Sequence, residues 1–386
     1  MRRVIEDLPG SMIREVANAG IGRDDVLAFW FGESDEVTPE PIREAAKRSI
    51  DAGETFYAHN LGLPELRDAI AAYTATLHPA VGAARIAVTS SGVSALMLAM
   101  QALVGAGDEV VAVVPVWPNL TAQPAILGAR VTRVALRPMG GAWRLDLDAL
   151  LAAVTARTAV LLVNSPNNPS GWTLSRDEQA AILAHCRRTG TWIVADEVYE
   201  RIHFGAVGSG SGCAPSFLDL AAADDRLVVV HSFSKSFLMT GWRLGWMVAP
   251  PSLMDALGKL IEFNTSCAPV FIQRAALAAL ESAATSVPAL VARLLRCRDT
   301  LLPLLAQMPR VEVASPEGGL YAFFRVEGQT DTLAFAERLV REFGLGLAPG
   351  EAFGAEAQGW LRWCFASNDP KRLVSGADRL ARALHL

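Results

Sequence analysis

A lysine set among small and apolar residues is the most specific candidate for chemistry in this chain. Lys235 follows the string Val230-His231-Ser232-Phe233-Ser234 and precedes Thr240-Gly241-Trp242-Arg243. Apolar surroundings can lower the pKa of a lysine, and a neutral amine is the form that makes an imine with a carbonyl group. Arg243 offers a planar fork suited to a phosphate. We therefore expect a reactive amine at Lys235, with an anion site beside it.

A buried carboxylate is the second candidate. The string Ala195-Asp196-Glu197-Val198-Tyr199 comes directly after an apolar run. A carboxylate there is costly to bury unless a cation lies beside it, and a protonated ring nitrogen would be such a cation. Taken alone, an aspartate that caps a loop explains the string equally well.

Three further strings could bind a ligand. Ser91, Gly92 and Val93 lie where a strand turns into a long helix, so backbone N–H groups and the helix dipole could hold a phosphate, although an N-capped helix gives the same pattern. Trp117 could stack on a flat ring, but packing is the commoner role of such a tryptophan. Asn168 lies in a turn-rich string after an apolar run, which favours a donor to a ligand oxygen.

The five strings share one position relative to the predicted strands. Short β-branched runs alternate with helical segments, at residues 85–89, 109–114, 130–135, 159–163, 191–195, 227–230 and 244–248. This alternation is typical of βαβ units in a mostly parallel sheet. Open parallel sheets bind ligands at the C-terminal ends of their strands, and each string follows a strand there. The sequence thus predicts that the five strings converge on one site.

The chain is long enough for two domains. At 386 residues it exceeds the size at which one hydrophobic core stops growing. Beyond residue 288 a helical segment leads to strands at 311–314, 319–326 and 360–365, which predict a smaller α+β unit. We expect a large domain at residues 45–285 and a small domain made of residues 1–44 and 286–386.

Composition favours small-molecule chemistry. The net charge is -5 without runs of like charge, so neither a nucleic acid nor a membrane is expected as partner. Five cysteines without a CxxC pair suggest reduced thiols in the cytoplasm, and no metal site is expected. No apolar stretch typical of a signal peptide follows Met1. Glycines at residues 205–212 do not lie between a strand and a helix, which indicates a loop rather than a nucleotide site.

Together and in this order, the strings resemble those of the fold-type I aminotransferases of class I/II, in particular the bacterial aspartate-aminotransferase-like branch. The likeness runs from Ser11-Met12-Ile13-Arg14-Glu15 through Asn167-Asn168-Pro169-Ser170-Gly171 to Leu361-Arg362-Trp363. It implies an α/β fold in which a large domain has a mostly parallel seven-stranded sheet between helices, next to a smaller α+β domain. It also implies pyridoxal 5′-phosphate (PLP) as cofactor and a homodimer with shared active sites.

The resemblance implies a role for each site residue. Lys235 would hold PLP as a Schiff base and move the proton between the substrate α-carbon and the cofactor. Asp196 would keep the pyridine nitrogen protonated, while Tyr199 and Asn168 would bind the phenolic oxygen. Trp117 would stack on the cofactor ring. The cofactor phosphate would be bound by Ser91, Gly92, Val93, Ser232, Arg243 and, from a second subunit, Tyr57. Arg362 would bind the substrate carboxylate, and Gly32 and Asn168 would line the same pocket.

The reaction implied is transfer of an amino group from an L-amino acid to a 2-oxo acid. A β-lyase of the same fold, similar to cystathionine β-lyase, would share these residues, so the sequence leaves both reactions open. The apolar run Ala28-Phe29-Trp30-Phe31 beside Gly32 favours aromatic or bulky side chains. No second arginine matches a family motif for a side-chain carboxylate, which argues against specificity for aspartate.

Overall fold

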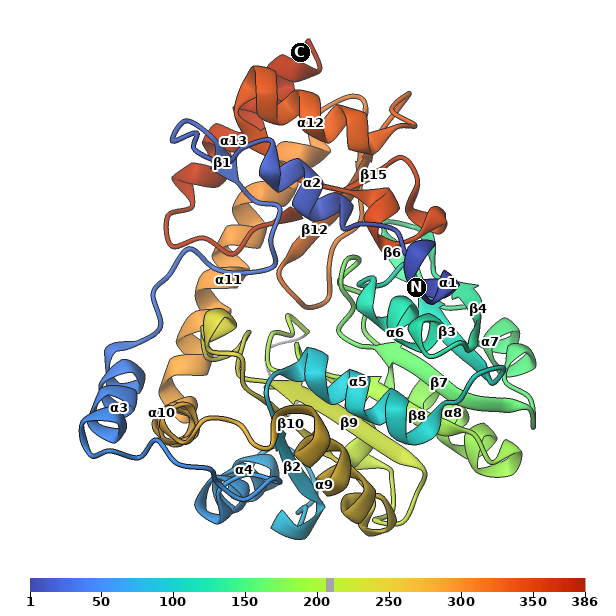
Figure 1. Cartoon of the computed structure of the whole chain (residues 1–386). Helices are drawn as coiled ribbons and strands as arrows, with labels where there is room; N and C mark the ends of the chain where they lie inside the picture. The colour runs from blue at the N-terminus through green and yellow to red at the C-terminus, as the bar shows by residue number, and fades with distance from the viewer. Residues whose placement is uncertain (206–211, 386) are drawn as a thin grey trace.

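A seven-stranded sheet forms the centre of the larger part of the molecule (Figure 1). The computed structural model describes residues 1–205 and 212–385, so most of the loop expected at 205–212 lies outside the described residues. The strands, in their order across the sheet, are β2 (Ile86–Thr89), β10 (Gly245–Val248), β9 (Leu227–Ser232), β8 (Trp192–Asp196), β7 (Thr158–Asn164), β3 (Glu109–Val114) and β4 (Arg130–Ala135). Only β10 runs antiparallel to its neighbours, which confirms the mostly parallel sheet.

Helices cover both faces of the sheet because its strands are apolar on both faces. Along β3, Val110, Ala112 and Val114 pack with α5 (Gly92–Leu103) and α9 (Pro251–Thr265). The alternate residues Val111 and Val113 belong to the opposite core, which includes α8 (Arg176–Thr189). Strands buried in this way read as continuous apolar runs, and this is why their positions could be predicted from the sequence.

The ends of the strands carry the polar strings. Strands β3 and β4 have the predicted bounds, whereas β8 runs one residue further, to Asp196, and β9 two residues further, to Ser232. These extensions place Asp196 and Ser232 in the ladder itself. Two helices have a proline in their first turn, α3 (Glu40–Asp51) and α4 (Pro64–Ala75).

A smaller antiparallel sheet lies beyond the carboxyl ends of these strands (Figure 1). Its order is β11 (Val311–Val313), β12 (Tyr321–Val326), β15 (Trp360–Cys364) and β14 (Ala348–Pro349). Helices α12 (Thr332–Phe343) and α13 (Lys371–Ala383) pack with it, and α11 (Ala283–Ala306) leads to it from α10 (Val270–Glu281). The remaining elements of the large part are α7 (Leu147–Ala153) and the hairpin of β5 (Arg137–Met139) and β6 (Ala142–Arg144).

The N-terminal segment contacts both parts of the molecule. Strand β1 (Leu27–Ala28) pairs in parallel with β13 (Leu345–Gly346), and α2 (Met12–Asn18) contacts α12. Before it, α1 (Arg3–Glu6) lies against α6 (Asn119–Ile126), where Arg2 Nη2 donates to the carbonyl of Ile126 at 2.7 Å. The exact domain bounds, 45–285 against 1–44 with 286–386, stay a prediction.

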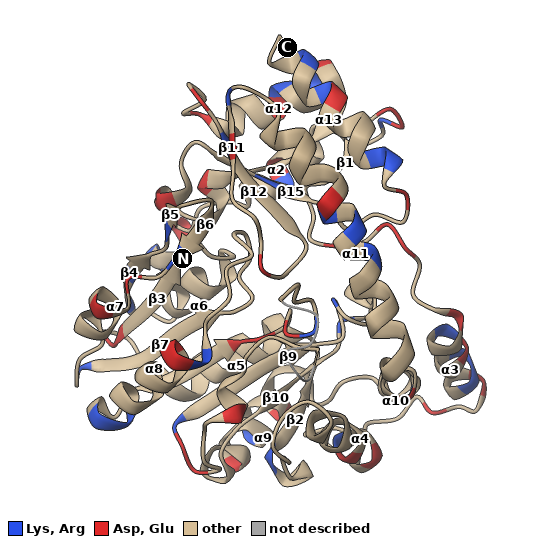
Figure 2. Cartoon of the chain, turned by 180° about the vertical axis from the view of Figure 1, so that it is seen from behind, with Lys and Arg blue, Asp and Glu red and all other residues tan. Residues whose placement is uncertain are grey.

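Charged residues lie mostly on the outer helices and loops, while the central strands have almost none (Figure 2). Within residues 1–205 and 212–385, no single helix combines the length and apolar character needed to cross a bilayer. The bent pair of α10 and α11 meets those requirements only when the two helices are taken together.

Candidate active site

One cavity of about 590 Å³ brings the predicted strings together. It lies at the carboxyl ends of β7, β8 and β9 and is closed on its other side by β12, β15 and the N-terminal segment. Its lining includes all the predicted site residues except Ser91 and Tyr57, namely Gly32, Gly92, Val93, Trp117, Asn168, Asp196, Tyr199, Ser232, Lys235, Arg243 and Arg362. The five strings therefore do converge, as the position of each after a strand predicted.

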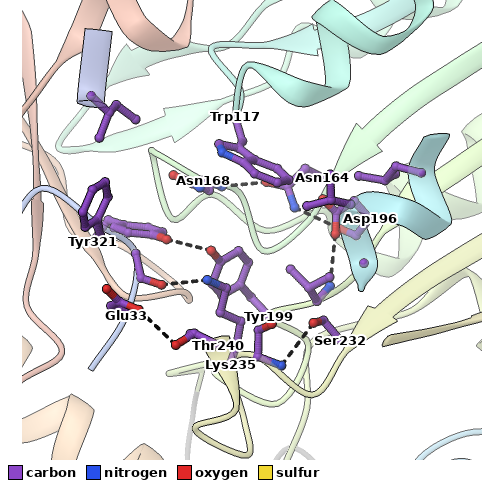
Figure 3. Close-up of a pocket in the computed structure, with 18 of the residues that line it drawn as sticks. Glu33, Trp117, Asn164, Asn168, Asp196, Tyr199, Ser232, Lys235, Thr240 and Tyr321 are labelled. Carbon is purple, nitrogen blue, oxygen red and sulfur yellow. Dashed lines mark hydrogen bonds between the residues drawn. The ribbon is translucent and has the colours of Figure 1, made fainter. Parts of the chain in front are cut away.

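Lys235 reaches into this cavity from the turn after β9. Its Nζ donates to the carbonyl oxygen of Gly32 at 2.7 Å (Figure 3). Burial lowers the pKa of Lys235 to about 8, and the positive charge of Arg362 acts in the same direction. A lysine with this pKa has a useful fraction of neutral amine near neutral pH, which is what imine formation and proton transfer require.

Asp196 is almost completely buried at the end of β8, with 2% of its surface exposed. Burial raises its pKa to about 7, although the Val198 N–H, which donates to Oδ1 at 3.3 Å, and the charge of Lys235 oppose the rise. A carboxylate this poorly solvated gains strongly from a cation placed beside it. A protonated pyridine nitrogen would be such a cation.

Asn164 is a site residue that sequence reasoning missed. It ends β7 and is paired in register with Asp196 on β8. Its side chain donates to the Asp196 carbonyl at 3.0 Å and accepts from the Asn168 N–H at 2.7 Å. The signal for this role was its place at a strand end in the same string as Asn168.

Arg362 is a buried cation without a carboxylate partner. Within the described part of the chain no Asp or Glu forms a salt bridge with it. Its Nη1 donates to Asn168 Oδ1 at 2.9 Å and its Nη2 to the Trp30 carbonyl, while Nε has no acceptor in the part of the chain that the structure describes. The guanidinium also lies 4.4 Å from the ring centroid of Tyr321. An arginine so enclosed, with donor capacity left over, is suited to an anionic ligand.

Tyr321, also missed at the sequence level, forms a pair with Tyr199. The two hydroxyl oxygens are 2.7 Å apart, and both rings are buried (Figure 3). Burial raises the pKa of Tyr199 well above its ordinary value and that of Tyr321 to about 12. A Cβ at Gly32 would lie 2.0 Å from Tyr321 Oη, so only glycine fits there. Gly32 thus lets the N-terminal segment approach the tyrosine pair closely.

The start of α5 has groups that could hold an anion. The Ser91 hydroxyl oxygen accepts from the Ser94 N–H at 3.0 Å, and the N–H groups of the first turn, at Gly92 and Val93, face the cavity end of the helix. Arg243 adopts left-handed backbone angles, φ 55° and ψ 59°, and its Nη1 donates to the Thr240 carbonyl at 2.6 Å. A strained arginine beside a helix N-terminus is a fitting arrangement for a phosphate.

These features together fit PLP. The cavity has a lysine of lowered pKa, a buried carboxylate for the ring nitrogen, and a cationic site for the phosphate. Trp117 lines the cavity and its backbone N–H donates to the Asn168 carbonyl at 2.8 Å, which holds those two strings side by side. Figure 3 shows Trp117, Asp196, Tyr199 and Lys235 around a shared space.

Two predicted residues lie elsewhere in the chain's own structure. Tyr57 is 89% exposed and does not line the cavity, which agrees with the expectation that it would act in a second subunit but does not test it. Ser91 is not among the lining residues, because its side chain caps the helix. Gly92 and Val93, the next residues, line the cavity instead.

A charged network lies behind the turn that carries Asp196 and Tyr199. The ring of His78 contacts Asp219 Oδ1 at 2.8 Å through Nδ1 and Glu200 Oε2 at 3.2 Å through Nε2. His231 Nδ1 lies 3.4 Å from Glu200 Oε1. Burial by itself would lower the pKa of His78, but the hydrogen bonds that its ring donates to the two carboxylates outweigh burial and raise that pKa to about 11. His78 is therefore charged in the folded protein at neutral pH.

This network is also the strongest candidate for a metal site. Glu197, Glu200 and His231 have candidate ligand atoms within 4.8 Å of one another. However, Glu197 already accepts hydrogen bonds from Ser216 Oγ at 2.5 Å and Phe217 N at 3.1 Å, and both oxygens of Glu200 face histidines. We therefore interpret the cluster as an internal ion network.

Replacing His78 with leucine is expected to lower the free energy of unfolding by about 3–5 kcal/mol, because it removes the charged partner of Oε2 of the buried Glu200 and one partner of Asp219. The folded pKa of His78, about 11, is above its unfolded value, so its stabilising effect is complete below about pH 6.5 and is lost as pH rises toward 11. Urea unfolding of both proteins between pH 6 and pH 10 measures this, with the exposed His385→Leu as control. If the difference in free energy of unfolding between the unaltered protein and His78→Leu grew with pH, His78 would not be a charged partner of the carboxylates.

Comparison with known proteins agrees with the site. The family model for aminotransferase class I and II matches residues 25–380. The chain is 35% identical to an arginine–pyruvate transaminase of Pseudomonas aeruginosa, over 93% of this chain and 88% of that protein. It is 32% identical to an aspartate aminotransferase of Thermotoga maritima, over 98% of this chain and 97% of that protein.

Solved structures show the same relationship. The crystal structure of an aspartate aminotransferase from Thermotoga maritima superposes with a TM-score of 0.90 at 31% identity and covers 100% of both chains. YbdL of Escherichia coli, identified by its crystal structure and reactivity as having a methionine aminotransferase function, gives a TM-score of 0.89 at 27% identity over 98% of each chain. The fold, the site and these relatives agree that the chain belongs to the class I and II aminotransferases, PLP-dependent enzymes that transfer an amino group between an amino acid and a 2-oxo acid.

Proposed function

We propose that this aminotransferase works through the cavity around Lys235, in the roles that the site geometry supports. One observation carries the proposal: a lysine of lowered pKa, a buried carboxylate and a buried arginine that pairs with no carboxylate among the described residues line the same cavity. PLP supplies an electron sink for the electrons of the bond broken at the substrate α-carbon. Lys235 would hold the cofactor covalently between turnovers.

The other residues would hold and orient the cofactor. Asp196 would share a proton with the ring nitrogen, which offsets the cost of its burial. Asn168 and Tyr199 would bind the oxygen on the ring, and Trp117 would cover one face of the ring. Gly92, Val93, Ser232 and Arg243, with Ser91 behind them, would hold the phosphate at the start of α5.

Proton transfer would fall to the amine of Lys235. With a pKa of about 8, it can accept a proton from the substrate α-carbon as a neutral amine near neutral pH, and as an ammonium group it would donate that proton to the cofactor. The carbonyl of Gly32, 2.7 Å from Nζ, would orient the amine during this exchange.

Arg362 would bind the substrate α-carboxylate with its free donor capacity, beside Gly32 and Asn168. Replacing it with lysine is expected to raise KM for the amino acid by about 30-fold, roughly 2 kcal/mol, because a point charge cannot replace a bidentate fork. Steady-state kinetics with saturating 2-oxo acid measure this, and the exposed Arg325→Lys serves as control. An unchanged KM, with the cofactor still bound, would show that Arg362 does not bind the substrate α-carboxylate.

The relatives disfavour the β-lyase alternative, because they are named as transaminases for arginine, aspartate and aromatic amino acids. Their different donors show that the family name does not fix the substrate. Of the apolar run at residues 28–31, only Phe31 lines the cavity, while Phe29 and Trp30 are buried in the core. We propose that the preferred amino donor is an amino acid with a bulky side chain, which would contact Phe31.

A homodimer is a further part of the proposal. Phe56 and Tyr57 after α3 and Phe263 on α9 are 83%, 89% and 90% exposed, and large side chains of this kind are typical of an interface. Tyr57 would reach the partner's phosphate site. Sedimentation equilibrium showing twice the chain mass of 41.2 kDa would support this, and a monomer would overturn it.

We also propose a cytoplasmic location, supported by five cysteines none of which forms a disulfide within the described residues.

A further inference from the structure

A second cavity continues the active site beyond the expected position of the substrate. It has a volume of about 830 Å³ and shares four lining residues with the first cavity: Ile13, Arg14, Phe31 and Trp117. Phe31 directly precedes Gly32, whose carbonyl contacts Lys235. The shared residues therefore mark a passage from the reactive lysine into additional space.

The walls of this second cavity are mostly apolar. They come from the segment before α2, from α6, from β4 and from the turn at Gly350–Phe353. The apolar residues include Leu8, Met12, Ile13, Phe31, Ala122, Ala125, Val131 and Phe353. A site of this size and lining can take an alkyl or aryl side chain longer than the reaction itself requires.

The charged residues in its lining, apart from Arg14, already have partners. Arg133 forms a two-point ion pair with Glu356, at 2.7 and 2.8 Å. Glu351 accepts hydrogen bonds from the backbone N–H and the hydroxyl of Thr332. Arg133 and Glu356 therefore compensate each other's charge, while Glu351 keeps its charge but has both carboxylate oxygens bonded to Thr332.

Arg14 is different. Its guanidinium lies 5.6 Å from the ring centroid of Phe31, and within residues 1–205 and 212–385 its side chain forms no hydrogen bond or ion pair. It lies on α2, whose neighbouring residues Ile13, Val16 and Ala17 are buried. The helix thus fixes its backbone, while the exposed side chain is left at the passage between the two cavities.

We propose that Arg14 is a specificity-determining residue that selects donors whose long, mainly apolar side chain ends in an anionic group and disfavours donors with a cationic end. This rests on the proposed function, because it places the donor α-carboxylate at Arg362 and its α-carbon near Lys235. A side chain that extends past Phe31 then passes the guanidinium. An uncompensated cation there attracts a negative end and repels a positive one.

Three donors of similar length separate charge from size: L-2-aminoadipate with an anionic end, L-norleucine with a neutral end and L-lysine with a cationic end. The measurement is kcat/KM for each donor with the PLP-loaded enzyme and one common 2-oxo acid. In the unaltered enzyme the ratio of aminoadipate to lysine should exceed one. In Arg14→Gln, relative to norleucine, the aminoadipate value should fall and the lysine value should rise, each by about fivefold.

Two variants control for indirect effects. Arg14→Lys keeps the charge and should retain the preference to within about twofold. Arg341→Gln removes an exposed arginine on α12 and should leave the ratio as it is. If Arg14→Gln leaves the ratio of aminoadipate to lysine unchanged while the donors still react, the inference is overturned and the proposed function stands. If no donor reacts with the loaded enzyme, the proposed function itself fails.

Discussion

Replacing Lys235 with alanine is expected to lower amino-group transfer by about 10⁴-fold, because the residue that would hold the cofactor and move the proton is removed in one step. The cofactor would then bind only through the noncovalent contacts to its ring and phosphate. The measurement is single-turnover conversion of the loaded enzyme to the amine form of the cofactor, followed by absorbance with excess amino acid.

The control for this variant is Lys259→Ala, which removes an exposed lysine on α9 that pairs with Asp255 at 2.5 Å. It should keep full activity. Circular dichroism would show that both variants fold. An alanine variant at 235 that still formed a borohydride-reducible imine with PLP would contradict the assignment.

Replacing Asp196 with asparagine is expected to lower turnover by about 10²–10³-fold, because a neutral amide cannot stabilise the protonated ring nitrogen. The change is nearly isosteric, so the fold should be kept. The measurement is kcat with a good donor, and Asp148→Asn on α7, in the first turn of that helix, is the control. A loss smaller than tenfold would mean that the ring nitrogen does not depend on this carboxylate.

The same variant should have the opposite effect on stability when PLP is absent. The folded pKa of Asp196, about 7, is above its unfolded value of about 4, so its burial costs stability progressively as pH rises from about 4 to about 7, and the full cost remains above pH 7. Asp196→Asn removes that charge and should raise Tm of the cofactor-free protein at pH 8 more than at pH 5. This pattern would show that Asp196 is kept for binding the cofactor and not for folding.

The site strings could be predicted from the sequence because each one follows a strand that is buried on both faces. Such strands are continuous apolar runs, and the rule for open parallel sheets then places their carboxyl ends together. Asp196, Asn168 and Lys235 were found in this way. The extra residues of β8 and β9 were not predicted, since polar ends such as Asp196 and Ser232 do not look like strand residues.

The part of the site contributed by the smaller sheet was harder to predict. Tyr321 lies on a strand whose position was predicted, but its contact with Tyr199 depends on how that sheet packs against the large domain. No local pattern encodes this packing. Arg362 was placed only through the family resemblance, and its two aromatic neighbours became visible only in the structure.

Long-range polar contacts were the least predictable. His78 and Glu200 are 122 residues apart in sequence, and an apolar segment with one histidine gives no sign of a buried ion network. Arg14 was seen only as part of a family string, and the cavity beside it depends on α2, α6 and the turn at Gly350–Phe353 coming together. Side chains that act through tertiary contacts need the structure before they can be interpreted.

The central claim is that the amine of Lys235 carries the cofactor, and borohydride reduction of the PLP-loaded enzyme followed by peptide mass spectrometry tests it most directly. The account predicts a pyridoxyl-phosphate adduct on the peptide that contains Lys235. The chain has three other lysines, Lys47, Lys259 and Lys371. An adduct on one of them alone, or no adduct on the saturated enzyme, would contradict the account.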